Sequence, residues 1–178
     1  MDEKWAFVYK KQEQCDLEDQ EDHTSGDCWD HVAFDPEHRL VLGVVFGKRS
    51  ASRIKSLLES VKEQLQDRTP ALVTSDQLSC YRTVIRQVWR SLLPLEKDPR
   101  CTRRTRHKQP RYGPEPALNY AMVCKERKDG RVVSVETQTV FGSDASVAAA
   151  LNASSASNTV NTSFVERQNL TMRMSMRR

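Results

Sequence analysis

The sequence has 178 residues, a length that suits one domain with a substantial hydrophobic core. Its longest apolar run, Leu40 to Phe46 with Gly43 inside it, is far shorter than the ~20 residues of a membrane-spanning helix. No basic and apolar leader opens the chain, and the five scattered cysteines are not the disulfide framework of a small secreted protein. We therefore expect a cytoplasmic protein.

The net charge of +4 is unevenly distributed. Residues 10–37 hold ten acidic residues and two lysines, whereas residues 97–111 hold seven bases and one acid. A solvated loop is the simplest interpretation of either run. The basic run is also rich in arginine and proline, so we interpret it as an extended arm that can lie along phosphates. Its candidate DNA-binding residues are Arg100, Arg103, Arg104, Arg106, Lys108 and Arg111.

The first part of the chain predicts an antiparallel meander. Residues 4–9 are aromatic and β-branched, as strands often are, and residues 30–35 and 40–46 form two further short strands. A turn at Pro36-Glu37 joins the last two, and short connections favour antiparallel neighbours.

The next segment predicts alternating helices and strands. From Ser50, apolar residues recur with the spacing of a helix that buries one face. Residues 71–75 form a short buried strand that ends at Asp76, and a second helix runs on to Pro94. This alternation favours an α/β layer arrangement. The apolar positions are Ile54, Leu57, Leu58, Val61 and Leu65 in the first helix and Tyr81, Val84, Ile85, Val88, Trp89 and Leu92 in the second.

Beyond the basic arm, the sequence predicts a hairpin and a short helix. Asp129-Gly130 separates two strand-like runs, residues 118–124 and 131–141, as in a β-hairpin. Ser143 or Asp144 can cap the short helix that follows. The small polar residues 152–160 then form a link to the last helix.

The last helix begins near Asn161, Thr162 or Ser163, whose side-chain oxygens can cap free N–H groups. Ser163 and Glu166 fit a capping box, in which the glutamate reaches back to the cap backbone. The alternative interpretation is that Glu166 faces into a site with carboxylates from elsewhere in the chain.

A helical wheel keeps this second interpretation open. It places Glu166 at the margin of a narrow apolar stripe, where a side chain can face a cleft beside a sheet. Arginines on the same side of the helix suit phosphate oxygens. The stripe is Val165, Met172 and Met176, and the neighbours of Glu166 are Asn169, Arg173 and Arg177.

Two aspartates adjoin the predicted strands. Asp2 stands before the first strand, and Asp76 ends the buried strand 71–75. Ligands of α/β sheets collect outside the carboxyl ends of strands, so the two carboxylates can meet if these strands are neighbours. The alternatives are that Asp76 is a turn or cap residue and that Asp2 is a disordered terminal residue.

Three blocks of the sequence resemble the catalytic blocks of bacterial insertion-sequence transposases with an Asp-Asp-Glu triad, in particular the insertion-sequence-one-like family. The similarity extends through residues 26–33, 35–39, 112–117, 130–133 and 140–142, and therefore covers nearly the whole chain. The three blocks are Asp2-Glu-Lys-Trp-Ala-Phe-Val8, Thr74-Ser-Asp76 with Tyr81 after it, and Asn161-Thr-Ser-Phe-Val-Glu-Arg-Gln-Asn169.

This resemblance implies an α/β fold of the ribonuclease H-like type, with a mixed five-stranded sheet flanked by helices. It implies that Asp2, Asp76 and Glu166 are the catalytic residues and hold two Mg²⁺ or Mn²⁺ ions, for which hard oxygen ligands are suited. Arg167, Asn169 and Arg173 join the basic arm as candidate DNA-binding residues. The implied partners are the DNA of element ends and target, bound by a homo-oligomer in the bacterial cytoplasm at the nucleoid.

The chain is interpreted as one ribonuclease H-like core over residues 1–178. Residues 1–96 hold three strands, a helix, the strand with Asp76 and a helix. Residues 97–117 are the basic arm, 118–160 the hairpin and short helix, and 161–178 the glutamate helix. Family members usually extend beyond this core at both ends, so we expect a shortened core with weak or absent activity.

Two other functions stay open. A non-catalytic DNA-binding or inhibitory transposase fragment would bind through the basic arm without cutting, and a ribonuclease H-like nuclease would act on another nucleic acid. A zinc site is a further possibility, because thiolate and imidazole suit that metal, but the series lacks the paired cysteines of structural zinc sites. Its members are Cys15, His23, Cys28 and His31, which we interpret as parts of an ordinary acidic loop.

Overall fold

Three strands near the N-terminus form an antiparallel sheet in the order β1-β2-β3. They are β1 (Asp2–Val8), β2 (Gly26–Asp35) and β3 (Leu40–Gly47). The structure is a computed structural model that describes residues 1–16, 18–93 and 112–175. The predicted meander is confirmed, with β2 longer at its start than we expected.

A second sheet has the order β4-β7-β8, in which β4 is parallel to β7 and β7 is antiparallel to β8. The turn between β7 and β8 has positive φ at both Asp129 (50°) and Gly130 (75°), as a two-residue type I′ hairpin requires. The predicted hairpin is therefore confirmed. These strands are β4 (Val73–Asp76), β7 (Tyr120–Lys128) and β8 (Arg131–Phe141).

A single five-stranded sheet was predicted, and the structure instead has two three-stranded sheets and a short ribbon. Within the described residues, no strand ladder joins β1 to β4. The link between them is one hydrogen bond, from the amino group of Met1 to the carbonyl oxygen of Thr74 (2.7 Å). The strand β1 pairs with β2 from Asp2 onward, and the bond from Met1 lies directly before that register. The mixed α/β class itself is confirmed.

Two helices bury the apolar faces that the sequence predicted. The helix α1 (Ala51–Gln64) packs on β2 and β3, and α2 (Ser79–Val88) packs on α1. The core between them also includes Val73 of β4 and Tyr120 of β7. The end of the second helix was predicted wrongly. It stops at Val88, Trp89 leaves helical geometry, and β5 (Arg90–Leu92) pairs with β6 (Tyr112–Pro114). The buried core residues include Ile54, Leu57, Leu58, Val61, Tyr81, Val84, Ile85, Val88 and Trp89.

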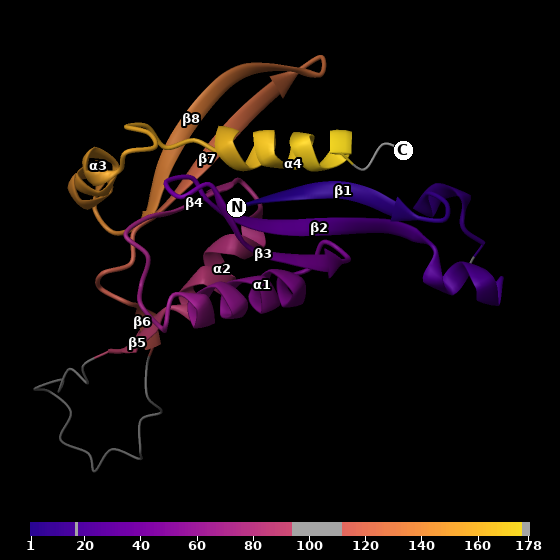
Figure 1. Cartoon of the computed structure of the whole chain (residues 1–178), viewed down its shortest axis with the longest axis horizontal. Coiled ribbons are helices and arrows are strands. Elements are labelled where there is room, and N and C mark those ends of the chain that lie inside the picture. Colours follow the sequence, from indigo (N-terminus) through magenta and orange to yellow (C-terminus); the bar gives the residue numbers. More distant parts are fainter. Residues whose placement is uncertain (17, 94–111, 176–178) are drawn as a thin grey trace, which may run out of the picture.

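Two further helices complete the four α-helices of the described chain. In α3 (Asp144–Ala153), the Ser143 hydroxyl oxygen accepts a hydrogen bond from the Ser146 backbone N–H, which confirms the predicted cap. The last helix, α4 (Ser163–Ser175), lies on the opposite side of the first sheet from α1 and α2 (Figure 1). The sheet is therefore covered on both faces.

Two short 3₁₀ helices, Gln12–Gln14 and Gln20–Thr24, lie between β1 and β2 in the acidic segment. Of the basic arm predicted at residues 97–117, residues 97–111 lie outside the described residues, and residues 112–114 form β6. Among the helices that are described, none has the length and apolar character needed to cross a membrane.

Candidate functional site

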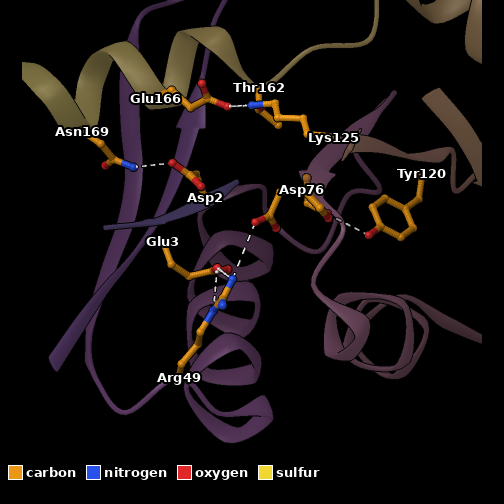
Figure 2. Close-up of polar contacts among 10 residues, drawn as sticks. Asp2, Glu3, Arg49, Asp76, Tyr120, Lys125, Thr162, Glu166 and Asn169 are labelled. Carbon is orange, nitrogen blue, oxygen red and sulfur yellow. Dashed lines mark hydrogen bonds and ion pairs between the residues drawn. The ribbon is translucent and has the colours of Figure 1, made fainter. Parts of the chain in front are cut away.

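Asp2, Asp76 and Glu166 line one cleft of about 460 Å³. They come from three elements, because Asp2 opens β1, Asp76 ends β4 and Glu166 lies in the first turn of α4 (Figure 2). The structure thus brings together three carboxylates that are far apart in the sequence. The other residues that line the cleft are Arg49, Gln77, Leu78, Val123, Lys125 and Arg127.

Asp2 is held in place by the last helix. The side-chain amide of Asn169 donates a hydrogen bond to Oδ2 of Asp2 (2.8 Å), and Asn169 is buried. Burial raises the pKa of Asp2, and the nearby Asp76 carboxylate raises it further, while the bond from Asn169 opposes the shift. Asp2 is therefore an ordered carboxylate of the cleft.

Asp76 stands at the carboxyl end of β4, directly beside Val123 of the parallel strand β7. Its Oδ1 atom is buried and has no hydrogen-bond partner among the described residues. Burial raises the pKa of this carboxyl, followed by the negative charge of Glu3, while Arg49 opposes the shift. A buried carboxylate oxygen without a donor is costly, and a cation in the cleft would satisfy it.

Glu3 and Arg49 lie next to Asp76, below it in the view of Figure 2. Two nitrogens of the Arg49 guanidinium donate to Oε2 of Glu3 (2.9 and 3.2 Å), and one lies 3.7 Å from Oδ2 of Asp76. The guanidinium also packs on the ring of Trp29. Burial, and then the charge of Glu3, raise the pKa of the Tyr81 hydroxyl well above its ordinary value. Through its contacts with Glu3 and Asp76, the positive charge of Arg49 partly balances a site rich in negative charge.

Glu166 does not form the capping box that its spacing with Ser163 allows. The N–H of Ser163 donates instead to the side chain of Asn161 (3.2 Å). Oε1 of Glu166 accepts from the Thr162 hydroxyl (2.5 Å) and pairs with the ammonium group of Lys125. Partial burial would raise the pKa of Glu166, but the bonds from Lys125 and Thr162 together outweigh burial and lower it. The Glu166 side chain thus lies between Thr162, directly before α4, and Lys125 of β7.

The donor set suits a hard divalent cation, which prefers carboxylate oxygens. The unpartnered Oδ1 of Asp76 and the mutual repulsion of Asp2 and Asp76 both favour such an ion. In residues 1–16, 18–93 and 112–175, however, no three acidic, histidine or cysteine side chains are grouped closely enough to hold one as they stand. In this arrangement the Glu166 carboxylate is paired with the ammonium group of Lys125 on β7.

The candidate DNA-binding residues are placed differently from one another. Asn169 is buried against Asp2, while Arg167 and Arg173 are exposed on α4. Candidates Arg100, Arg103, Arg104, Arg106, Lys108 and Arg111 lie outside the described residues.

The cysteine and histidine series is spread over the acidic segment and β2. The Cys15 thiol donates to the carbonyl oxygen of Lys11 (3.4 Å). The ring of His31 is fully buried in β2, with Nε2 at 3.3 Å from the carbonyl oxygen of Lys48.

Sequence reasoning missed Glu3, Arg49, Lys125 and Arg127 as members of this site. The alternation of Val123, Lys125 and Arg127 along one face of a strand is a signal for the last two, but residues 125–128 were interpreted as the approach to a turn. Glu3 and Arg49 meet through tertiary packing, and no local pattern indicates their contact.

If Asp2 holds a divalent cation, replacing Asn169 with alanine is expected to weaken Mn²⁺ binding by about 10- to 100-fold, because partners that orient a metal ligand typically contribute that much. Titration calorimetry of the variant measures the effect. Leu170→Ala, an exposed position on the same helix, is the control and should bind as the wild type does. Equal affinities for the Asn169 variant and the wild type would show that Asp2 is not oriented by this bond.

No protein family, curated protein or solved structure that was compared with the chain matches it.

Proposed function

We propose that this chain is the catalytic core of a metal-dependent DNA transposase of the Asp-Asp-Glu type. The observation that carries the proposal is the convergence of Asp2, Asp76 and Glu166 on one cleft that also contains Arg49, Lys125 and Arg127. The carboxylates of such a cleft are suited to divalent cations, and its basic residues are suited to an anionic substrate. The phosphodiester backbone of DNA is an anionic substrate of this kind.

The strand arrangement supports a ribonuclease H-like fold. The antiparallel meander β1-β2-β3 starts next to β4 of the second sheet. The hydrogen bond between Met1 and Thr74 joins the two. The helix α1 packs on one face of the meander, with α2 beside it, and the glutamate helix α4 packs on the other face (Figure 1). The carboxylates gather where β1 begins and β4 ends, at the border between the two sheets.

When bound, two Mg²⁺ or Mn²⁺ ions would activate water or a DNA 3′-hydroxyl and stabilise the leaving oxygen of an in-line displacement. Asp2, Asp76 and Glu166 would hold them. The chain's own residues supply the positioning: Asn169 orients Asp2, and Arg49 holds Glu3 beside Asp76. Lys125 and Arg127 supply positive charge for phosphate oxygens along one wall.

The test is a cleavage and strand-joining assay on supercoiled plasmid in Mn²⁺ or Mg²⁺. Wild type should nick slowly, and Asp76→Ala and Glu166→Ala should each lose the metal-dependent product. Nicking that these substitutions leave unchanged would contradict the carboxylate assignment.

A second candidate is a non-catalytic DNA-binding fragment. The observation that favours it is the pairing of Glu166 with Lys125. One of the three carboxylates is thereby bound to a lysine ammonium group instead of a metal ion. In the same assay this candidate predicts DNA binding without nicking in either metal, with an affinity that falls steeply as salt rises.

A further inference from the structure

Strand β7 carries a row of positive charge into the cleft. Asp76, the last residue of β4, pairs with Val123, so β7 continues beyond the end of its parallel neighbour. Side chains two residues apart share a face of a strand. Lys125 and Arg127 therefore follow Val123 along the cleft wall, and all three line the cleft.

Lys125 is engaged with the glutamate helix rather than with solvent. Its ammonium group pairs with Oε1 of Glu166 and lies 3.4 Å from the hydroxyl oxygen of Thr162 (Figure 2). About a quarter of the Lys125 side chain is exposed (26%), against 43% for Glu166. Thr162 is buried and donates to the same Oε1 atom. The glutamate therefore keeps one neutral donor if Lys125 leaves.

We propose that Lys125 is a partner-exchanging residue, which pairs with Glu166 in the metal-free chain and binds a DNA backbone phosphate once a divalent cation takes its place at Glu166. This inference rests on the proposed function and names the residue that couples metal binding to DNA binding at the site.

Charge and reach support the exchange. A lysine ammonium is a compact charge on a flexible stem with three donors, so it can change partners without a change in the backbone. A cation at Glu166 would repel the ammonium group at contact distance. Arg127 lies two residues along the same wall, so a phosphate entering beside Lys125 would meet two positive charges.

The test compares wild type with Lys125→Met in two measurements. The control is Lys128→Met, which removes the same charge from an exposed residue of β7 outside the cleft. Calorimetric titration without DNA should show that Lys125→Met binds Mn²⁺ about two- to fivefold more tightly than wild type, because a competing cation is gone.

The second measurement is fluorescence anisotropy of a labelled DNA duplex over a range of salt concentrations, recorded before strand cutting accumulates. In saturating Mn²⁺, Lys125→Met should lower the slope of log affinity against log salt by about one relative to wild type, as the loss of one phosphate contact does. In EDTA the two slopes should agree. Lys128→Met should change the slope equally in both conditions.

Three results would overturn the exchange. Equal salt slopes for wild type and Lys125→Met in Mn²⁺ would mean that Lys125 stays paired with Glu166. A difference of about one between the two slopes already in EDTA would mean that Lys125 is a permanent phosphate contact. Weaker Mn²⁺ binding by Lys125→Met would mean that lysine only orients the glutamate. Failure of the wild type to bind Mn²⁺ is a separate result, which contradicts the proposed function itself.

Discussion

Replacing Asp76 with asparagine is expected to reduce Mn²⁺-dependent plasmid nicking by roughly a thousandfold or more, while it raises the melting temperature of the metal-free protein. The activity falls because asparagine removes the charge that a divalent cation requires from this ligand. The stability rises because Asp76 is a partly buried carboxylate whose Oδ1 has no donor among the described residues. Asparagine has nearly the same shape and carries no charge.

The direction of the stability change follows from the raised pKa of Asp76. Between the ordinary pKa of the carboxyl and its raised folded-state pKa, the folded chain binds more protons than the unfolded chain. The free energy of unfolding therefore decreases as pH rises through that window, and the loss persists above it. At neutral pH the substitution should recover about 1 kcal/mol, a melting increase of about 2–4 °C for a chain of this size.

Thermal melts in EDTA between pH 3 and pH 8 measure this effect. Asp67→Asn is the control, because that carboxylate is mostly exposed (86%) and should change neither melting temperature nor nicking. A metal-free Asp76→Asn protein that melts below wild type at neutral pH would show that the charge of Asp76 stabilises the fold.

The second large effect is expected at Lys4, whose replacement by methionine should destabilise the protein by about 3–5 kcal/mol. Lys4 pairs with Asp30 at 2.7 Å, and both side chains are nearly buried, with 5% and 11% exposed. The two residues face each other across β1 and β2. Lys4 lies on the same face of β1 as Asp2, and Asp2 contacts α4. Because this face is covered by α4, methionine at position 4 would leave the Asp30 carboxylate buried and unpaired.

Urea denaturation of the single and double variants measures the cost. Lys4→Met combined with Asp30→Leu should recover most of the lost stability, because no unpaired charge then remains. The exposed pair Lys55–Glu59 is the matched control, and Lys55→Met should leave stability nearly unchanged. A Lys4→Met protein as stable as wild type would show that Asp30 finds water or another donor.

The parts of the fold that depend on local patterns could be predicted from the sequence. The apolar spacing of Ile54, Leu57, Leu58 and Val61 fixed the buried face of α1, and these residues are buried. The Asp129-Gly130 pair identified its hairpin because both residues accept positive φ.

The parts that depend on distant partners could not. Apolar spacing continues from α2 into Trp89 and Leu92, so the helix was predicted to continue. The structure ends it at Val88 because residues 90–92 pair with residues 112–114. The number of sheets was mispredicted for a similar reason, since it depends on how far β1 overlaps β4.

The candidate site likewise contains some residues that local patterns predicted and others that they did not. Asp2, Asp76 and Glu166 were predicted as one group, and they line one cleft. The bond between Asn169 and Asp2 was not predicted, because the wheel could not show which edge of the apolar stripe would be buried. Lys125 is one of several charged residues near a turn, and nothing local distinguishes the one that meets Glu166.

Calorimetric titration of Mn²⁺ into the DNA-free protein tests most directly whether Asp2, Asp76 and Glu166 together hold divalent cations. The wild type should bind two Mn²⁺ ions. The combined variant Asp76→Asn and Glu166→Gln should bind none, while melting in EDTA as a folded protein. Mn²⁺ binding by that variant with the stoichiometry and affinity of the wild type would contradict the carboxylate assignment.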